Sequence, residues 1–435
     1  MADDAALARV HVLVDLAQRP GSGGHVKVWE RLAAAAIGLE TELDLTVHFA
    51  GDVSGTRALA SNVRFKTHRS IFSSSRLPFL ADMPDHADLA PYHPVLARDL
   101  AGAEVIHTTD AYFVFARTAE RLARRRRLPL VTSIHTDTPR YTSVFAAATI
   151  ERLFGEGRVA RLLNERAALP DRAEARMRAR LAEHQRRCAA VVVSRPDQLE
   201  PLGRLLSPAR VSLLRRGVDR DVFRPRPADR AWLDGVFDVP SGRVVIMVVG
   251  RLDRGKNVMT AVEAVHTLVG EGLPVHLLCV GEGPERRAIF ARLGARASCA
   301  GTLAPTDLSR AYASADVVAH PSLIEETSNI CLEALACGRP LLVAAESGGG
   351  RHVVEGETGL VVRGGDPASW VEALRRVVTD EGLRARLGAA AAAWAVDGIP
   401  TWREVLLDDL LAVWRRARTT SVVQRKPQQS PRSDN

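Results

Sequence analysis

The stretch VVIMVVGRLDRGKN, residues 244–257, contains a complete passage from a strand to a helix. Its six leading apolar residues predict a buried β-strand, and a helix-like pattern begins directly after it. The glycine-punctuated loop between them includes the cations Arg251 and Lys256. Ligands of α/β sheets bind beyond the carboxyl ends of strands, so this loop is predicted to hold a phosphate-bearing ligand.

The loop comes close to the phosphate loop of ATPases without completing it. That motif requires Ser or Thr directly after Gly-Lys, because the hydroxyl ligates magnesium. Asn257 stands at this position, and no acidic strand end stands out as a magnesium partner. An ATPase is therefore disfavoured, and two cations on such a loop suit a diphosphate held without metal. A solvated turn without a ligand is the alternative that the loop alone leaves open.

The same alternation of strand and helix runs through the whole chain. The first set of expected strands covers residues 10–16, 45–50, 105–109, 128–136 and 189–195, and the second covers 243–251, 275–281, 316–322, 340–345 and 359–362. Two such arrays predict an α/β protein with two Rossmann-like, doubly wound domains.

A proline-containing stretch without a periodic core, residues 220–243, marks the boundary between the two arrays. The expected organisation is a first domain at 1–225, a second at 226–398, an amphipathic helix within 399–418 and a polar, disordered tail at 419–435.

Composition limits the classes of partner. The net charge of +8 comes almost entirely from arginines that are interleaved with acids, which predicts a solvated surface and no nucleic-acid site. No apolar run approaches the roughly 20 residues of a membrane span, and acids precede any apolar run at the N-terminus, so a cytoplasmic protein is expected. The five cysteines lack metal-ligand spacing, so reduced thiols and no bound metal are expected.

Two further loops are candidates for ligand contact. In GSGGHV, residues 21–26, Gly23 and Gly24 allow a ligand to approach the backbone and a helix start, although Val26 replaces the last glycine of a dinucleotide fingerprint. In HPSLIEETSNICLEALACGRP, residues 320–340, an acidic loop precedes a helix whose first N–H groups, around Ser328, can bind phosphate. For residues 21–26 the alternative is a tight turn without a ligand. For residues 320–340 the alternative is that Glu325 and Glu333 are a chance pair without a function.

Three polar residues stand at expected strand ends of the first domain. His135, Asp110 and Asp137 occupy positions where α/β sheets place ligands. A satisfied structural histidine is the alternative for His135. For the aspartates, which are the nearby acids able to orient an acceptor, helix capping or loop solvation is equally compatible with the sequence.

Taken in order, these motifs resemble the family 4 retaining glycosyltransferases of the GT-B fold. The resemblance spans both domains through GSGG, IHTDTP, RRGVDRDVFRP, VVGRLDRGKN, VGEGPER, AGTLAPTDLSRAYASADVVAHPS, EETSNICLEALACGRP and ESGGGRHVVEGETGLVV. It implies two Rossmann-like domains that face a cleft, with the nucleotide sugar mainly on the second domain and the acceptor on the first. It also implies that the last helix crosses back to the first domain.

The resemblance assigns roles to individual residues. Arg251 and Lys256 would hold the diphosphate and stabilise its departure, Glu333 would bind ribose hydroxyls, Glu325 would contact the donor sugar and His135 would face that sugar. The expected catalytic set is Arg251, Lys256, His135 and Glu325; further donor contacts are Gly23, Gly24, Glu282, Ser328, Asn329, Ile330 and Glu333, with Ser322 beside them; acceptor contacts are Asp110 and Asp137.

The implied chemistry is a front-face transfer in which the departing diphosphate helps to take the acceptor proton, with no metal and no cofactor. One departure concerns Glu325-Glu326-Thr327-Ser328, where the family often has Glu-Thr-Phe-Gly. The lost aromatic and glycine change the wall near the donor sugar, and Glu326 adds a carboxylate. A glucose-type donor is therefore not carried over.

The expected function is transfer of a sugar from a GDP- or UDP-sugar to a small soluble acceptor, in bacterial secondary-metabolite or antibiotic, small-thiol or aminocyclitol biosynthesis. The alternative is a peripheral-membrane enzyme acting on a lipid or polysaccharide precursor. Segments 117–129 and 151–187 are rich in arginine but offer few exposed aromatics, which favours a solvated surface over membrane association. The oligomeric state, including a dimer, stays open.

Overall fold

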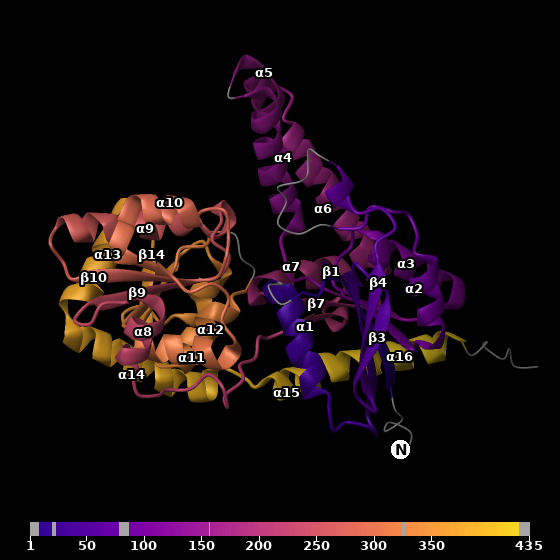
Figure 1. Cartoon of the computed structure of the whole chain (residues 1–435). Coiled ribbons are helices and arrows are strands. Elements are labelled where there is room, and N and C mark those ends of the chain that lie inside the picture. Colours follow the sequence, from indigo (N-terminus) through magenta and orange to yellow (C-terminus); the bar gives the residue numbers. More distant parts are fainter. Residues whose placement is uncertain (1–7, 20–22, 78–86, 156, 324–326, 426–435) are drawn as a thin grey trace, which may run out of the picture. The chain divides into compact units, whose positions relative to one another are not determined.

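The computed structural model describes residues 8–19, 23–77, 87–155, 157–323 and 327–425. They divide into two compact units, the first containing Met1–Arg215 and Arg403–Asn435 and the second Arg216–Trp402. Each unit is an α/β domain built on its own, mainly parallel sheet (Figure 1). The prediction of two doubly wound domains is confirmed.

The sheet of the first unit has the strand order β3-β4-β2-β1-β5-β6-β7-β8 within the described residues. Neighbours pair in parallel except β3 with β4. The strands are β1 (Ala8–Ala17), β2 (Leu43–Gly51), β3 (Gly55–Ala60), β4 (Val63–Arg69), β5 (Val105–Thr108), β6 (Leu130–Ser133), β7 (Ala190–Val193) and β8 (Val211–Leu213). The order reverses at β1, so the carboxyl ends of β1 and β5 are the expected ligand edge of this unit.

The helices of the first unit cover this sheet and end with the last segment of the chain. They are α1 (Gly24–Ala35), α2 (Pro94–Asp99), α3 (Val114–Arg126), α4 (Thr138–Phe154), α5 (Arg158–Arg161), α6 (Leu169–Arg187), α7 (Leu199–Leu206) and α16 (Ala412–Arg425), the last preceded by a π-helical stretch at Val405–Leu411 and by α15 (Trp402–Glu404).

The final helix packs on the first unit, as expected. The indole of Trp414 is fully buried and donates to Nδ1 of His107 at 2.9 Å. Arg415 forms an ion pair with Glu42 at 2.8 Å. The helix continues to Arg425, so the expectation of a disordered tail from residue 419 is wrong for its first part, because the packed helix propagates past the polar residues. Residues 426–435 lie outside the described residues.

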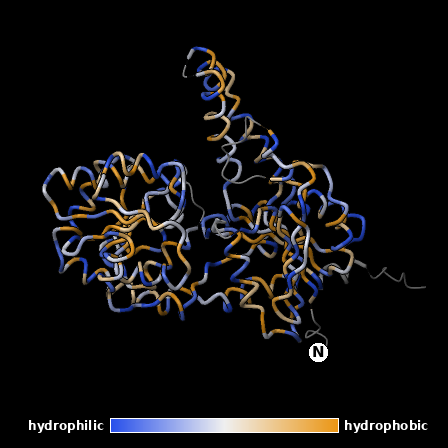
Figure 2. Tube along the Cα trace, viewed as in Figure 1, coloured by the Kyte–Doolittle hydropathy of each residue, from blue (hydrophilic) through white to orange (hydrophobic). Residues whose placement is uncertain are grey.

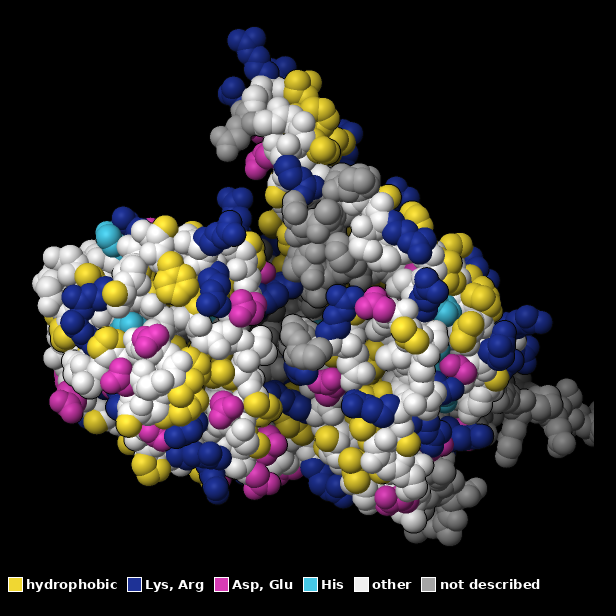
Figure 3. All heavy atoms as spheres, viewed as in Figure 1, with side chains coloured by type: hydrophobic (Ala, Val, Ile, Leu, Met, Phe, Trp, Pro, Cys, Tyr) yellow, Lys and Arg dark blue, Asp and Glu magenta, His cyan; other side chains and the backbone are white. Residues whose placement is uncertain are grey.

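The long helices α4 and α6 pair with each other and extend away from the sheet of the first unit (Figure 1). Large apolar side chains near their connection are about half exposed, namely Leu153, Phe154, Val159 and Leu162. Hydrophobic side chains gather at this end of the hairpin (Figure 3). The surface over 151–187 was predicted to be solvated and rich in arginine; the structure adds exposed apolar side chains that the sequence analysis did not single out.

The sheet of the second unit has the order β11-β10-β9-β12-β13-β14 in the described chain, and all its pairs are parallel. Its strands are β9 (Val244–Val249), β10 (Val275–Val280), β11 (Ala297–Cys299), β12 (Val317–His320), β13 (Leu341–Ala344) and β14 (Gly359–Val362). Its helices are α8 (Arg230–Phe237), the 3-10 turn η7 (Arg254–Lys256), α9 (Val258–Gly270), α10 (Arg286–Leu293), α11 (Pro305–Ser314), α12 (Asn329–Ala336), the 3-10 turn η9 (Gly348–His352), α13 (Pro367–Thr379) and α14 (Glu381–Gly398).

Burial on both faces explains the continuous apolar run of β9. Ile246 and Val248 belong to the core that contains residues of α9 and α13, whereas Val245 and Met247 belong to the core that contains residues of α12 and α14. Figure 2 shows that hydrophobic residues concentrate in the strands at the centre of this unit. Such double burial is typical of parallel strands covered by helices on both sides.

The chain enters the second unit between Arg215 and Arg216, earlier than the boundary that the prolines predict at residue 225. The reason is that Val218 and Phe223 are buried in the core of the second unit. The Val218 N–H also donates to the carbonyl of Pro400 at 3.0 Å. Among the described helices, none combines the length and the apolar character that crossing a membrane requires.

Candidate functional site

The loops that carry the predicted phosphate contacts meet at the carboxyl edge of the second sheet. β9 lies between β10 and β12, so the strand order reverses here. The hydroxyl of Ser322, after β12, donates to the carbonyl of Gly255 at 3.4 Å. The side-chain amide of Asn257 donates to the carbonyl of Pro321 at 3.3 Å. This reversal is the position at which open α/β sheets bind ligands.

Glycines allow the loops after β9 and β10 to touch. A Cβ on Gly281 would lie 1.9 Å from the carbonyl oxygen of Gly250, and one on Gly283 would lie 2.3 Å from that of Leu252. Gly281 also has a φ of +133°, which other residues rarely adopt. The Leu252 N–H donates to the carbonyl of Glu282 at 2.9 Å. This contact fixes the backbone that carries the two cations.

The carboxylate of Asp253 holds the backbone of the turn that carries Lys256 and pairs with the side chain of Arg251. Asp253 accepts from the backbone N–H of Lys256 at 3.0 Å and pairs with the guanidinium of Arg251 at 3.1 Å. The Lys256 side chain passes over Gly250, where a Cβ would lie 3.9 Å from Cε of Lys256 and 3.4 Å from Cδ1 of Ile330. Lys256 is thereby placed beside the first turn of α12. The sequence analysis missed Asp253, although an acid just before a tight turn is a capping signal.

The charge of this edge comes from the loop cations rather than from the neighbouring histidine. His320, at the end of β12, is buried, and burial together with the charge of Lys256 lowers the pKa of His320 to about 3. The ring is therefore neutral at physiological pH.

Asn257 serves the turn into α9. Its backbone is left-handed, with φ of 53° and ψ of 34°, a conformation that asparagine adopts more readily than most residues. Its side-chain oxygen accepts from the hydroxyl of Thr260 at 2.9 Å, and its nitrogen reaches Pro321. The residue that stands where a phosphate loop needs a hydroxyl is therefore used for backbone geometry.

The amino end of α12 lies against the same edge. Ser328 precedes the helix with an extended backbone, and its side chain makes no capping bond. The Oδ1 atom of Asn329 is buried without a hydrogen-bond partner in the described part of the chain. A Cβ on Gly349 would lie 2.6 Å from Sγ of Cys331, so the glycine turn of η9 closes tightly on the helix start. Uncapped N–H groups and the helix dipole suit an anion.

Arg216 is a buried cation near this helix that the sequence analysis missed. Its side chain is 6% exposed, and Nε donates to the hydroxyl of Thr327 at 2.8 Å, one residue before Ser328. Burial and then the charges of Arg351 and Arg216 lower the pKa of His352 to about 4. Arg216 directly precedes Gly217 in RRGVDRDVFRP, and no pattern in the neighbouring sequence indicates that its side chain is buried.

The three predicted glutamates differ in their surroundings. Glu333 is 5% exposed on α12 and accepts from the hydroxyl of Tyr312 at 3.5 Å. The side chain of Glu282 is 59% exposed and pairs with Arg286 at 3.4 Å. Glu325, with Glu326, lies outside the described residues. The structure thus brings Glu333 into the α12 region, whereas Glu282 contributes its backbone to the loop contact and leaves its carboxylate at the surface.

In the first unit, His135 lies beside the glycine turn that precedes α1. Its ring is 7% exposed and stacks on that of His25, with centroids 4.3 Å apart, and Nε2 lies 2.7 Å from the hydroxyl of Ser133. His25 directly follows Gly24, and a Cβ on Gly23 would meet no atom of the described residues within 4 Å. The predicted turn and the predicted histidine therefore share one edge, with space above Gly23 that no described residue fills.

Asp110 and Asp137 both hold helix starts. Oδ1 of Asp110 accepts from the N–H groups of Tyr112 at 2.7 Å and Phe113 at 3.1 Å, just before α3. Oδ1 of Asp137 accepts from the N–H of Arg140 at 3.2 Å and caps α4. Capping, one of the two interpretations left open by the sequence, is what these carboxylates do in the structure.

Asp15, on β1, is a buried acid that the sequence analysis did not single out. It is 2% exposed, and its Oδ2 accepts from the N–H of Phe115 at 3.1 Å. Burial, followed by the charge of Asp110, raises the pKa of Asp15 well above its usual range. The sequence did contain a signal for a buried acid, because Asp15 stands inside the apolar run VHVLVDL.

Three strands of the first unit also bring histidines together. Nδ1 of His11 lies 2.9 Å from Nε2 of His48, and Nδ1 of His48 lies 2.8 Å from Nε2 of His68. His48, His68 and Asp99 offer ligand atoms within 4.8 Å of one another, a spacing compatible with a metal ion. Lys66 already pairs with Asp99 at 2.9 Å, which opposes a second cation there. The absence of a bound metal stays a prediction.

Comparisons with known proteins show what the chain is similar to. Residues 243–380 match the family described as glycosyl transferases group 1. The D-inositol 3-phosphate glycosyltransferase of Rhodococcus erythropolis is 31% identical over 241 residues, which are 52% of this chain and 53% of that relative. The chain thus spans about half the length of the curated relatives it matches.

Two solved structures extend the likeness over both units. Sucrose-phosphate synthase from Thermosynechococcus elongatus has a TM-score of 0.67 at 18% identity and covers 95% of this chain and 100% of its own. Anabaena Alr3699/HepE in complex with UDP-glucose has a TM-score of 0.59 at 15% identity, with 96% and 99% covered. At these identities the likeness shows the fold, which is GT-B. The second unit is thus similar to the group 1 glycosyl transferases, and both units share the fold of these solved structures.

Proposed function

We propose that the protein is a retaining, metal-independent glycosyltransferase that moves a sugar from a GDP- or UDP-sugar to a small soluble acceptor. The observation that carries this proposal is the convergence of Arg251, Lys256 and the uncapped start of α12 at the strand-order reversal of the second sheet. Two cations beside free N–H groups suit the two phosphates of a nucleoside diphosphate.

In the proposed reaction, the bond between the anomeric carbon and the diphosphate breaks as an acceptor oxygen bonds to the same face of the sugar. Negative charge grows on the departing diphosphate, where Arg251 and Lys256 stabilise it. The acceptor proton passes to an oxygen of that diphosphate. Glu333, buried and hydrogen-bonded to Tyr312, has the acceptor atoms that ribose hydroxyls require.

For the acceptor we propose a small polyol or its phosphate, within bacterial secondary-metabolite, antibiotic, small-thiol or aminocyclitol biosynthesis. The name of the relatives, D-inositol 3-phosphate glycosyltransferase, supports a cyclitol phosphate. In the first unit the space above Gly23, beside His25 and His135, is the proposed acceptor edge. We further propose a cytoplasmic location.

One observation favours a second candidate, a peripheral-membrane enzyme that glycosylates a lipid or polysaccharide precursor. The exposed Leu153 and Phe154 at the end of the α4–α6 hairpin form an apolar surface of the kind that marks contact sites. Vesicle co-sedimentation of the wild type and of a Leu153→Ser/Phe154→Ser variant separates the candidates. Pelleting that the variant loses supports the membrane enzyme, and wild-type protein that stays in the supernatant supports the soluble acceptor.

The proposed activity is tested by thermal shift with UDP, GDP, ADP and dTDP, followed by transfer assays with the matching nucleotide sugars and myo-inositol phosphate. A ligand at 100 times its Kd stabilises the folded protein by about 2.7 kcal/mol, so one of these diphosphates should raise Tm clearly. NMR of the product should show the anomeric configuration of the donor. No shift with any of the four, or an inverted product, contradicts the proposal.

A further inference from the structure

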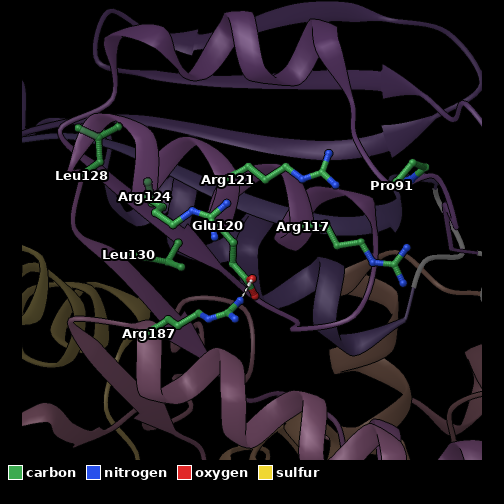
Figure 4. Close-up of a pocket in the computed structure, with 9 residues that line it drawn as sticks. Pro91, Arg117, Glu120, Arg121, Arg124, Leu128, Leu130 and Arg187 are labelled. Atoms are coloured by element: carbon green, nitrogen blue, oxygen red, sulfur yellow. Dashed lines mark hydrogen bonds and ion pairs between the residues drawn. The ribbon is translucent and has the colours of Figure 1, made fainter.

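A hollow lies in the first unit, between α3 and the end of α6 (Figure 4). Its volume is about 670 Å³. Arg117, Arg121 and Arg124 reach it from α3, and Arg187 reaches it from α6. Leu130, the first residue of β6, lies at its base, so the hollow extends to the amino edge of the sheet. His135 follows the carboxyl end of the same strand, which separates the hollow from the proposed acceptor edge.

The carboxylate in the hollow is already surrounded by cations. Glu120 accepts from Arg180 at 2.6 Å and from Arg187 at 2.7 Å, and it lies 2.5 Å from Nδ1 of His184. Burial opposes the charge of Glu120, but the hydrogen bonds from His184 and Arg180 hold its pKa at about 2. Burial likewise opposes the charge of His184, but Cys188 and Glu120 raise its pKa to about 10. Three cations therefore share one carboxylate.

The remaining arginines of the hollow have no carboxylate partner among the described residues. Arg124 makes no hydrogen bond or ion pair there, and the guanidinium of Arg121 lies 5.7 Å from the ring centroid of Tyr92. Arg117 donates to the carbonyl of Leu89 at 3.1 Å. Stabilisation of the helix dipole accounts for a cation in the last turn of α3, such as Arg124. It does not account for Arg117 and Arg121, which precede that turn.

We propose that this hollow binds a small polyanion that carries two or more phosphate groups. Planar guanidinium groups bind phosphate through paired N–H donors, and arginines from two helices can hold two phosphates at once. The volume lies within the range of about 300–1,000 Å³ that is typical of small-molecule sites. The site is separate from the donor site of the second unit, and it does not depend on which nucleotide sugar the protein uses.

The test is isothermal titration of the full-length protein with sodium tripolyphosphate, in wild type and in an Arg121→Gln/Arg124→Gln variant. Both side chains are exposed, so the fold should be kept, which an unchanged thermal midpoint verifies. Arg172→Gln/Arg176→Gln is the matched control, because it removes two exposed charges of α6 outside the hollow. Binding should weaken about tenfold or more in the first variant and less than about twofold in the control.

Tripolyphosphate can also enter the donor site, so the titration is repeated with Lys256→Ala. Binding that persists in Lys256→Ala and fails in Arg121→Gln/Arg124→Gln assigns the ion to the hollow. Vesicles of phosphatidylcholine with cardiolipin, a lipid that carries two phosphate groups, form a second arm. Pelleting that the double variant loses and the control keeps supports the same chemistry with a lipid headgroup as the source of phosphate. The proposal is overturned if the double variant and its control behave alike in both arms.

Discussion

Gly283→Ala tests whether the contact between the loops after β9 and β10 fixes the cation-bearing turn. The added Cβ would lie 2.3 Å from the carbonyl oxygen of Leu252 and 2.7 Å from its nitrogen, whereas ordinary contact begins at 3.4 Å. The loops must therefore separate, which strains the bond from the Leu252 N–H to Glu282 at 2.9 Å and that from the Glu285 N–H to Leu252 at 3.0 Å. At about 1 kcal/mol for each bond, the free energy of local opening falls by about 2 kcal/mol.

Hydrogen–deuterium exchange measures this local opening directly. A loss of about 2 kcal/mol corresponds to exchange about 30-fold faster at the amides of Leu252 and Glu285. Gly235→Ala is the control, because its Cβ in α8 meets no atom of the described residues within 4 Å, and helix propensity should stabilise that helix by about 1 kcal/mol. Unchanged exchange at the two amides in Gly283→Ala would refute the idea that this contact fixes the turn.

Two further predictions concern the first unit. Trp414→Phe removes the bond to His107 and leaves a buried ring nitrogen without its donor, so the unfolding free energy should fall by about 1–3 kcal/mol; a urea titration with an unchanged midpoint would contradict this. His11 and His68 should make the unit sensitive to acid. Burial is the main reason why the pKa values of both rings are lowered to about 4. Between pH 6.5 and pH 4 the unfolded chain therefore binds more protons than the folded one. The stability that is present above pH 6.5 is lost as the pH falls toward 4. Thermal midpoints at pH 7, 6 and 5 should decrease in this order, and a constant midpoint would show that the rings do not titrate differently on folding.

The strands that the sequence predicted are those buried on both faces. β9 and β10 are continuous apolar runs because helices cover both sides of the sheet. β4, with the sequence VRFKTHR, escaped prediction because only two apolar residues, Val63 and Phe65, carry its alternation. β3 at that edge is largely exposed, and β8 and β11 have only three residues each, too few for a periodic signal.

The site was predictable where its chemistry is local in the chain. Arg251 and Lys256 lie within one turn after a recognisable strand, so their neighbourhood followed from sequence order. Arg216 and Asp15 acquire their surroundings from distant segments, namely Thr327 and Phe115, and no local pattern reports such contacts. For Asp110 and Asp137 the sequence could not decide between helix capping and ligand contact, because both roles use the same position before a helix.

The central claim is that Lys256 holds the diphosphate of a nucleotide sugar. Isothermal titration of the stabilising nucleoside diphosphate with wild type, Lys256→Ala and Arg254→Ala tests it most directly. Arg254 belongs to the same turn but is exposed, so its removal takes one positive charge from almost the same place.

A charge-assisted hydrogen bond of about 1.5–3 kcal/mol predicts a loss of affinity of about 10- to 150-fold in Lys256→Ala and a change below about twofold in Arg254→Ala. Wild-type affinity in Lys256→Ala, or equal losses in the two variants, would contradict the claim.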